Sequence, residues 1–340
     1  MNQTLQLLRI ISSPFEKASV PPTNNRQLLD LYRYSIKNRM SFFFLEALKT
    51  SNRITPLESV YEREYKKYLI TVDAIARISL LLAEKNIEHA IFKTIRPYKS
   101  TTVDIDILIF GNIDNYKRSV KVMREAGYSL VTEGPNSTTL WDGKANIGID
   151  LYNQVAVSFI IYIDKEKLTS YVISMKLLNG ESIKTLKPEA DLACVIAHSV
   201  IKEQMYTLAE YFTFMHYLKQ LNINDFLYVV KQSNITTAVM THASITALLH
   251  KAAHNTIPDK LQQILNAVGE KNLETTRLIK NNFETPHKYH LITVAETFLE
   301  TAKTKKNRNS MAMQIYHMLN PNFTKKILKR LLQHMKRETY

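Results

Sequence analysis

The segment Val103-Asp104-Ile105-Asp106-Ile107-Leu108-Ile109-Phe110 places two carboxylates one residue apart in an otherwise β-branched and apolar run. Val and Ile at this density predict a buried strand. Residues i and i+2 of a strand project from the same face, roughly 7 Å apart. Burying two like charges on one apolar patch is costly unless a positive charge lies between them, and a divalent cation is the simplest such partner.

A third carboxylate, Asp150, lies in a second strand-like run, Ile147-Gly148-Ile149-Asp150-Leu151-Tyr152. One predicted helix and a hairpin separate the two runs, a connection that can place the second strand beside the first. Asp104, Asp106 and Asp150 on neighbouring strands would hold two Mg²⁺ (or Mn²⁺) ions, because hard cations prefer oxygen ligands. Two such ions activate a hydroxyl and stabilise a leaving phosphate. The sequence therefore predicts phosphoryl or nucleotidyl transfer, with these three residues as catalytic metal ligands.

Helical patterns lie on both sides of a strand-rich middle section. Helical spacing covers residues 27–49 and 61–84, and Pro188 fits the first turn of a helix that continues to about residue 221. Strand-like runs, interrupted by one predicted helix at 114–126, cover residues 89–92, 103–110, 128–132, 138–141, 147–152 and 155–163. We expect a helical cap (1–85), an α/β core (86–186), a helical domain (187–302) and a basic amphipathic tail (303–340).

This order of elements resembles the nucleotidyltransferase fold of the DNA polymerase β superfamily. More narrowly, the chain is similar to a group of uncharacterised nucleotidyltransferase-like proteins with an N-terminal helical cap, over roughly residues 27–221. In that group a Lys-Gly pair ends the first strand, an Asp-Ile-Asp follows, and an Ile-Asp-Leu strand supplies the last carboxylate. The matching stretches here are Ile91-Phe92-Lys93-Thr94, Asp104-Ile105-Asp106 and Ile149-Asp150-Leu151.

The resemblance implies an α+β fold, a small mixed sheet flanked by N-terminal and C-terminal helical regions. It also implies a metal-dependent enzyme that moves a nucleoside monophosphate from an NTP such as ATP to an acceptor hydroxyl, releasing pyrophosphate. Asp104 and Asp106 would hold both metals, and Asp150 would ligate the metal near the acceptor and help remove its proton. The acceptor stays open among RNA, particularly a tRNA end, a small molecule and a protein hydroxyl.

The first motif departs from the superfamily, which normally has Gly followed by Gly or Ser where this chain has Lys93-Thr94. Cβ atoms occupy space that glycine leaves open for the triphosphate. Thr94 offers phosphate a hydroxyl and an amide, while Lys93 and Arg96 offer positive charge. Related enzymes supply a further basic residue from a helix after the core, a role that the resemblance gives to Lys202. The nucleotide-binding candidates are therefore Lys93, Thr94, Arg96 and Lys202.

Two alternatives of other classes stay open. A catalytically degenerate protein of this fold would bind nucleotide or nucleic acid without transferring it. A protein-interaction partner, for example in a toxin–antitoxin-like system, would bind no metal.

Other polar residues of the predicted Pro188 helix and its surroundings have structural interpretations. His198 is expected to be a core or interface histidine, and Asp191 and Glu210 are expected to be helix-surface charges. Tyr152 shares a strand face with Asp150, so it either borders the site or packs. Cys194, the only cysteine, lies in an apolar stretch and predicts a buried thiol without a disulfide.

The net charge of +14 is concentrated at the C-terminal end of the chain. Residues 303–340 hold ten Lys and Arg against Glu338 alone, which accounts for nine of these charges. Apolar residues at helical spacing predict a basic amphipathic helix there; they are Phe323, Ile327, Leu328, Leu331, Leu332 and Met335. This helix would dock on the helical domain, contact the phosphates of an RNA acceptor, or lie on an anionic membrane.

The remaining composition sets limits on location. No apolar run approaches the roughly 18 residues that a membrane span needs. The beginning Met1-Asn2-Gln3-Thr4 lacks the basic and apolar order of a signal peptide, so we expect a cytoplasmic protein.

Overall fold

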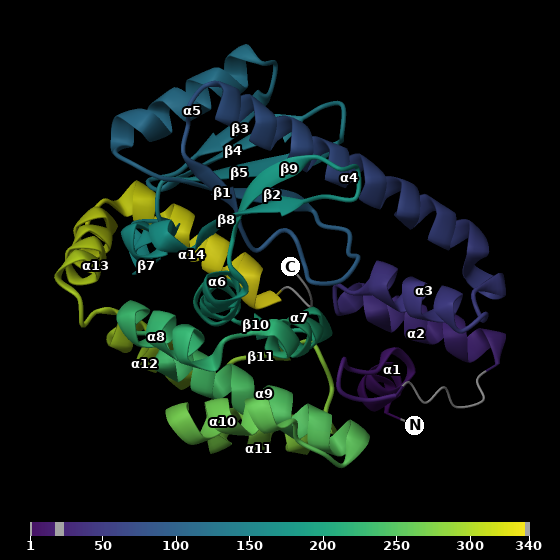
Figure 1. Ribbon diagram of the computed structural model, residues 1–340. Helices are drawn as coiled ribbons and strands as arrows, with labels where there is room; N and C mark the ends of the chain where they lie inside the picture. The colour runs from purple at the N-terminus through teal and green to yellow at the C-terminus, as the bar shows by residue number, and fades with distance from the viewer. Residues whose placement is uncertain (1, 18–23, 337–340) are drawn as a thin grey trace.

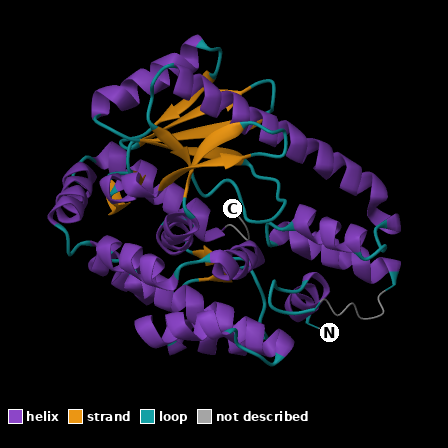
Figure 2. Cartoon of the chain, viewed as in Figure 1, coloured by secondary structure: helices purple, strands orange, loops and turns teal. Residues whose placement is uncertain are grey.

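A seven-stranded mixed sheet forms the centre of the computed structural model, which describes residues 2–17 and 24–336, except the side chains of 326 and 330–336. The strand order is β3-β4-β5-β2-β1-β9-β8, with β2 antiparallel to β1 and parallel to β5 (Figures 1 and 2). The strands are β1 (His89–Ile91), β2 (Asp104–Ile109), β3 (Ser129–Glu133), β4 (Ser137–Asp142), β5 (Ile147–Tyr152), β8 (Val172–Lys176) and β9 (Ser182–Leu186). The α+β prediction is confirmed.

The two faces of the sheet carry different side chains because residues alternate along each strand. Ile105 and Ile107 of β2 pack in one apolar cluster with α4 (Glu58–Glu84) and α5 (Ile113–Glu125). Asp106 alternates with them and lines a pocket together with His198 of α6 and Glu210 of α7. Figure 1 shows these two helices below the sheet. The alternation therefore buries the isoleucines and turns the acidic residues of β2 toward the helical half of the molecule.

That helical half has its own apolar core, in which helices from the beginning of the chain pack against the later ones. The backbone amide of Leu208 donates to the side chain of Asn38 (3.1 Å), and the Arg9 guanidinium donates to the carbonyl of Ala253 (3.1 Å). The helices of this half are α1 (Gln3–Ile11), α2 (Asn25–Lys37), α3 (Ser41–Thr50), α6 (Pro188–Ile201), α7 (Leu208–Gln220), α8 (Ile223–Ser233), α9 (Thr236–His254), α10 (Asp259–Val268), α11 (Asn272–Lys280) and α12 (Leu291–Thr301). The boundaries of the four predicted zones stay a prediction.

Several predicted elements are wrong in detail. The helix expected at residues 27–49 is two helices, broken where Arg39 adopts a φ of +58°. The strand expected at 155–163 is a hairpin of β6 (Val155–Val157) and β7 (Ile160–Ile163), turned at Ser158 with a φ of +54°. Helix α6 ends before residue 221, because β10 (Met205–Tyr206) pairs with β11 (His287–Lys288) ahead of α7. In addition, 3₁₀ helices lie at Thr55–Leu57 and Lys165–Tyr171.

The basic tail forms two helices, α13 (Lys305–Met318) and α14 (Pro321–Lys336). Ser310 and Gln314 of α13 accept hydrogen bonds from backbone amides of the β6–β7 hairpin, at 3.0 and 3.2 Å. Among the residues that the structure describes, every helix is too short or too polar to span a bilayer. Arg337 and Glu338 lie outside the described residues, and so do the side chains of Lys326, Arg330, Leu331, Leu332, Met335 and Lys336.

Candidate active site

Three carboxylates converge where β2 and β5 lie side by side. The two strands pair in parallel, with Asp106 directly opposite Asp150, and Asp104 lies two residues before Asp106 on the same face. One carboxylate oxygen from each residue lies within 4.8 Å of the others. The structure therefore brings together the three acidic residues that the sequence singled out.

Burial and mutual repulsion shift the pKa values of this acidic triad. Burial, followed by the charges of Asp106 and Asp150, raises the pKa of Asp104 to about 7. Burial and the charge of Asp106 also raise the pKa of Asp150. Burial would raise the pKa of Asp106 as well, but the neighbouring basic residues, Lys93 foremost, together outweigh it, and this pKa is lowered. For Asp104 and Asp150, burial and repulsion therefore outweigh the attraction of the nearby Lys93 and Lys202.

The triad fits a divalent cation, because carboxylate oxygens are the ligands that Mg²⁺ and Mn²⁺ prefer. Asp150 is held from outside: the Thr139 hydroxyl donates to its Oδ1 at 2.6 Å, and the Tyr152 hydroxyl donates to its Oδ2 at 3.4 Å. Such outer partners commonly fix the orientation of metal-binding carboxylates. Tyr152 thus borders the site, which is one of the two roles expected for it.

Lys93 reaches the triad from the end of β1. Its Nζ lies 3.2 Å from Oδ1 of Asp106 and 3.1 Å from Nδ1 of His198. Its backbone amide donates to Oδ1 of Asp191 at 2.7 Å. Lys93 therefore connects the carboxylates with α6 through both its backbone and its side chain.

Thr94, the other residue of the altered first motif, lies shortly after the end of β1. Its hydroxyl accepts a hydrogen bond from the Asp106 amide at 2.7 Å and donates to the Phe92 carbonyl at 3.3 Å. The hydroxyl that was expected to meet phosphate instead links β1 with β2. A phosphate-binding role for Thr94 stays a prediction.

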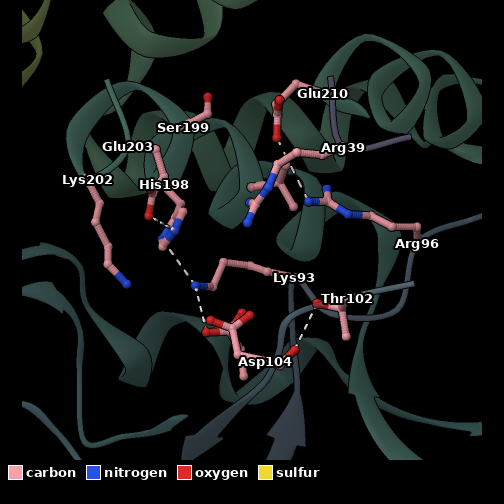
Figure 3. Close-up of a pocket in the computed structure, with 12 residues that line it drawn as sticks. Arg39, Lys93, Arg96, Thr102, Asp104, His198, Ser199, Lys202, Glu203 and Glu210 are labelled. Atoms are coloured by element: carbon pink, nitrogen blue, oxygen red, sulfur yellow. Dashed lines mark hydrogen bonds and ion pairs between the residues drawn. The ribbon is translucent and has the colours of Figure 1, made fainter. Parts of the chain in front are cut away.

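His198, Lys202 and Glu203 form the far wall of the site (Figure 3). Burial, together with the charges of Lys93 and Lys202, lowers the pKa of His198 to about 3, so its ring is neutral. A proton on Nε2 satisfies both neighbours, because Glu203 lies 3.1 Å from Nε2 while Nδ1 faces Lys93. Burial would raise the pKa of Glu203, but the hydrogen bond from His198 lowers it to about 2. Lys202 donates to the Tyr152 hydroxyl at 3.1 Å.

The prediction that Asp191 and Glu210 are helix-surface charges is wrong. Asp191 is only 3% exposed and Glu210 only 2%. The Tyr217 hydroxyl donates to Oδ2 of Asp191 at 2.7 Å, and Glu210 accepts from the Thr207 amide at 2.9 Å. Helices α6 and α7 are apolar on nearly all sides, a pattern typical of buried helices that the sequence did contain.

Basic and acidic residues together line the pocket beside the triad, Glu203 and Glu210 among them. A pocket of about 80 Å³ is lined by Asp104 and Asp106, and also by Arg39, Arg96 and Lys202 (Figure 3). An adjoining cavity of about 440 Å³ shares Arg39 and Arg96 with it. Four of its lining residues are basic and only Glu64 is acidic; the basic residues are Arg39, Arg63, Lys67 and Arg96.

Sequence reasoning missed Arg39, Arg63 and Lys67. Each is a basic residue in a zone of helices, where lysine and arginine ordinarily face water, so no local pattern distinguishes them. Only the fold brings α2, α3 and α4 to the loop before β2, where these residues meet Arg96.

No family model and no curated protein sequence matches the chain. Three solved structures are similar to the chain. The antibiotic-resistance factor ANT(2'')-Ia is 13% identical, and the match covers 48% of this chain and 90% of that chain with a TM-score of 0.37. A STING-associated CdnE c-di-GMP synthase from Capnocytophaga granulosa is 12% identical, and the match covers 86% of this chain and 100% of that chain with a TM-score of 0.33. The third, an antigenic nucleotidyltransferase-like protein from Paracoccidioides brasiliensis, is 12% identical, and the match covers 66% of this chain and 96% of that chain with a TM-score of 0.29.

The strands and helices around the carboxylates follow the order on which the resemblance rests: strand, Asp-Ile-Asp strand, helix, hairpin and Asp150 strand. The observed sheet places the Asp-Ile-Asp strand between the strand that ends in Lys93 and the strand that carries Asp150. Two members of the acidic triad, Asp104 and Asp106, line a pocket with residues of α6 and α7.

Proposed function

We propose that the protein is a metal-dependent nucleotidyltransferase, which moves a nucleoside monophosphate from an NTP to an acceptor hydroxyl and releases pyrophosphate. The observation that carries the proposal is the convergence of Asp104, Asp106 and Asp150 on one face of two parallel strands. A divalent cation bound by these carboxylates would lower the pKa of the attacking hydroxyl and neutralise charge on the phosphates.

The residues of the chain divide the remaining work. Asp150, oriented by Thr139 and Tyr152, accepts or directs the proton that leaves the acceptor hydroxyl. Arg39 and Arg96 line both the triad pocket and the adjoining basic cavity, and they supply positive charge to the triphosphate. Lys202, held at Tyr152, adds a third cation at the opposite wall.

An RNA acceptor, particularly a tRNA end, fits the excess of positive charge at the C-terminal end of the chain. The lysines of α13 and α14 would then hold the phosphate backbone while the acceptor end enters the site. A small molecule or a protein hydroxyl would instead use the 440 Å³ cavity alone.

One observation favours the catalytically degenerate alternative. The Lys93 ammonium already forms an ion pair with Asp106, so one carboxylate of the triad has a cation without any metal. A protein that only binds nucleotide or nucleic acid would need no metal ion beside this ion pair.

Transfer of label tests the proposal against that alternative. Protein would be incubated with each α-labelled NTP, Mg²⁺ or Mn²⁺ and total RNA, with Asp104→Ala as the inactive variant. Asp30→Ala, a change on the exposed side of α2, is the matched control. The proposal predicts labelled RNA with the unmutated protein and the control but not with Asp104→Ala. NTP binding without label transfer to RNA, small molecules or the protein itself supports the degenerate alternative.

A further inference from the structure

Lys93 has a backbone conformation that ordinarily belongs to glycine. Its φ of +60° lies in the left-handed region, which residues with a Cβ atom seldom adopt. The buried carboxylate of Asp191 holds this turn by accepting the Lys93 amide at 2.7 Å. Uncommon conformations of this kind cluster at functional sites, so a lysine kept there indicates a function for its side chain.

The Lys93 ammonium lies among the carboxylates and is shielded from water. Its side chain is 4% exposed, and its Nζ is 3.2 Å from Oδ1 of Asp106. The aromatic rings of Phe92 and Tyr152 flank it, with centroids 4.6 and 4.8 Å from Nζ. Figure 3 shows the extended side chain directed at the acidic residues. An ion pair in such a setting is several times stronger than one at the surface.

His198 fixes the ammonium from the other side. Its neutral ring accepts from Nζ at 3.1 Å through Nδ1, and Glu203 holds the ring through Nε2 at 3.1 Å. The ammonium therefore has partners on both sides and occupies a defined position beside Asp106.

That position conflicts with a two-metal centre. Two adjacent metal ions would each need oxygen ligands from these same three carboxylates. Oδ1 of Asp106 instead faces Nζ, whereas a Mg²⁺ ion would need this oxygen at about 2.0–2.1 Å. The charges agree, because one divalent ion and one ammonium balance three ionised carboxylates.

We propose that the Lys93 ammonium takes the place of one of the two metal ions, so that the acidic triad binds a single divalent cation beside a fixed lysine. The inference rests on the proposed function, because both concern the same carboxylates. It also gives a purpose to Lys93 at the first glycine position of the superfamily motif: the lysine supplies a cation instead of a space for phosphate.

The number of Mn²⁺ ions bound per chain tests this inference. Metal-free full-length protein would be titrated with Mn²⁺, with free Mn²⁺ followed by electron paramagnetic resonance and total binding followed by calorimetry. The unmutated protein is expected to bind one ion. Lys93→Met keeps the length of the side chain without its charge, and Lys93→Gly suits the positive φ; both are expected to bind two.

Lys202→Met is the matched control, because it removes another cation near the triad, one whose ammonium donates to the Tyr152 hydroxyl. It is expected to bind one ion, like the unmutated protein. Near-ultraviolet circular dichroism of each metal-free variant verifies the fold, and Lys93→Gly serves if Lys93→Met does not fold.

Two outcomes overturn the inference while leaving the proposed function intact: two ions bound by the unmutated protein, or one ion bound by both folded Lys93 variants. Absence of saturable binding at millimolar Mn²⁺ in every protein removes the metal centre itself. The inference and the proposed function would then fail together, and this result is distinct from the other two.

Discussion

Asp106 on β2 and Asp150 on β5 are direct register partners in a parallel strand pair. Because parallel partners project from the same face, this pairing fixes the position of the third carboxylate relative to the first two. The pairing joins segments that are separated by α5 and by the β3–β4 hairpin. The acidic triad is therefore a product of the sheet topology, and its chemistry depends on that register.

Metal affinity should depend strongly on pH near neutrality. Asp104, with a pKa of about 7, and Asp150, whose pKa is also raised, must lose protons before they bind a cation. We expect Mn²⁺ affinity to fall by roughly tenfold per pH unit once the pH drops below 7, since at least one proton is displaced. Calorimetric titrations from pH 5.5 to 8 measure this slope, and a constant affinity across the range would contradict it.

Asp104→Asn should stabilise the metal-free protein at pH 8. The raised pKa means that the folded state binds more protons than the unfolded state between about pH 4 and 7, so stability falls as pH rises through this window. Removing the charge should recover roughly 1–3 kcal/mol of unfolding free energy at pH 8 and little at pH 4. Urea unfolding in a chelating buffer measures both values. A loss of stability at pH 8 would show that the charge is better solvated than the structure indicates.

Asp191→Ala should destabilise the protein and disturb the position of Lys93. The change removes the acceptor of the buried Lys93 amide and the nearer acceptor of the Tyr217 hydroxyl, at a cost of roughly 2–4 kcal/mol. Thermal and urea unfolding measure the loss. Asp30→Ala on the exposed side of α2 is the control and should change stability by less than about 0.5 kcal/mol. Equal effects of the two changes would argue against the buried role of Asp191.

Arg39→Gln should weaken NTP binding without weakening Mn²⁺ binding. Arg39 lines both the triad pocket and the adjoining basic cavity, whereas the carboxylates that would hold the metal lie on the strands. We expect a loss of roughly tenfold in NTP affinity, typical of one charge-assisted contact. Arg33→Gln, a change at an exposed arginine of α2, the helix before Arg39, is the matched control. A similar loss in both variants would place the NTP elsewhere.

The tail should contribute a salt-dependent term to RNA binding. Lys325 and Lys329 are exposed on α14, and replacing both with Gln should reduce the slope of log affinity against log salt by about 1.5–2. Lys117→Gln combined with Lys121→Gln on exposed positions of α5 provides a control of equal charge change. An unchanged slope together with recruitment to anionic vesicles would favour the membrane alternative.

The acidic strands could be predicted because β-branched residues surround their carboxylates, and this pattern is local. Strands β8 and β9 were missed because Ser174, Lys176 and Lys184 give them a mixed, half-exposed pattern. The hairpin at Ser158 turns without the Gly, Asn or Pro that ordinarily predicts a turn.

The surroundings of the site were harder to predict than its carboxylates. Asp191 resembles any acidic residue in the first turn of a helix, and its partners Lys93 and Tyr217 come from distant parts of the chain. The ion pair of Lys93 with Asp106 depends equally on a backbone conformation that the residue type disfavours. Such contacts are set by tertiary structure, so no pattern of nearby residues predicts them.

The most direct test of the central claim is a calorimetric Mn²⁺ titration of the unmutated protein beside Asp106→Asn and Asp150→Asn. The account predicts saturable binding at pH 8 by the unmutated protein and a loss of at least roughly tenfold in affinity in each variant, because each removes one anionic ligand. Binding of equal strength by all three proteins, or by none, would contradict a metal centre built from the acidic triad.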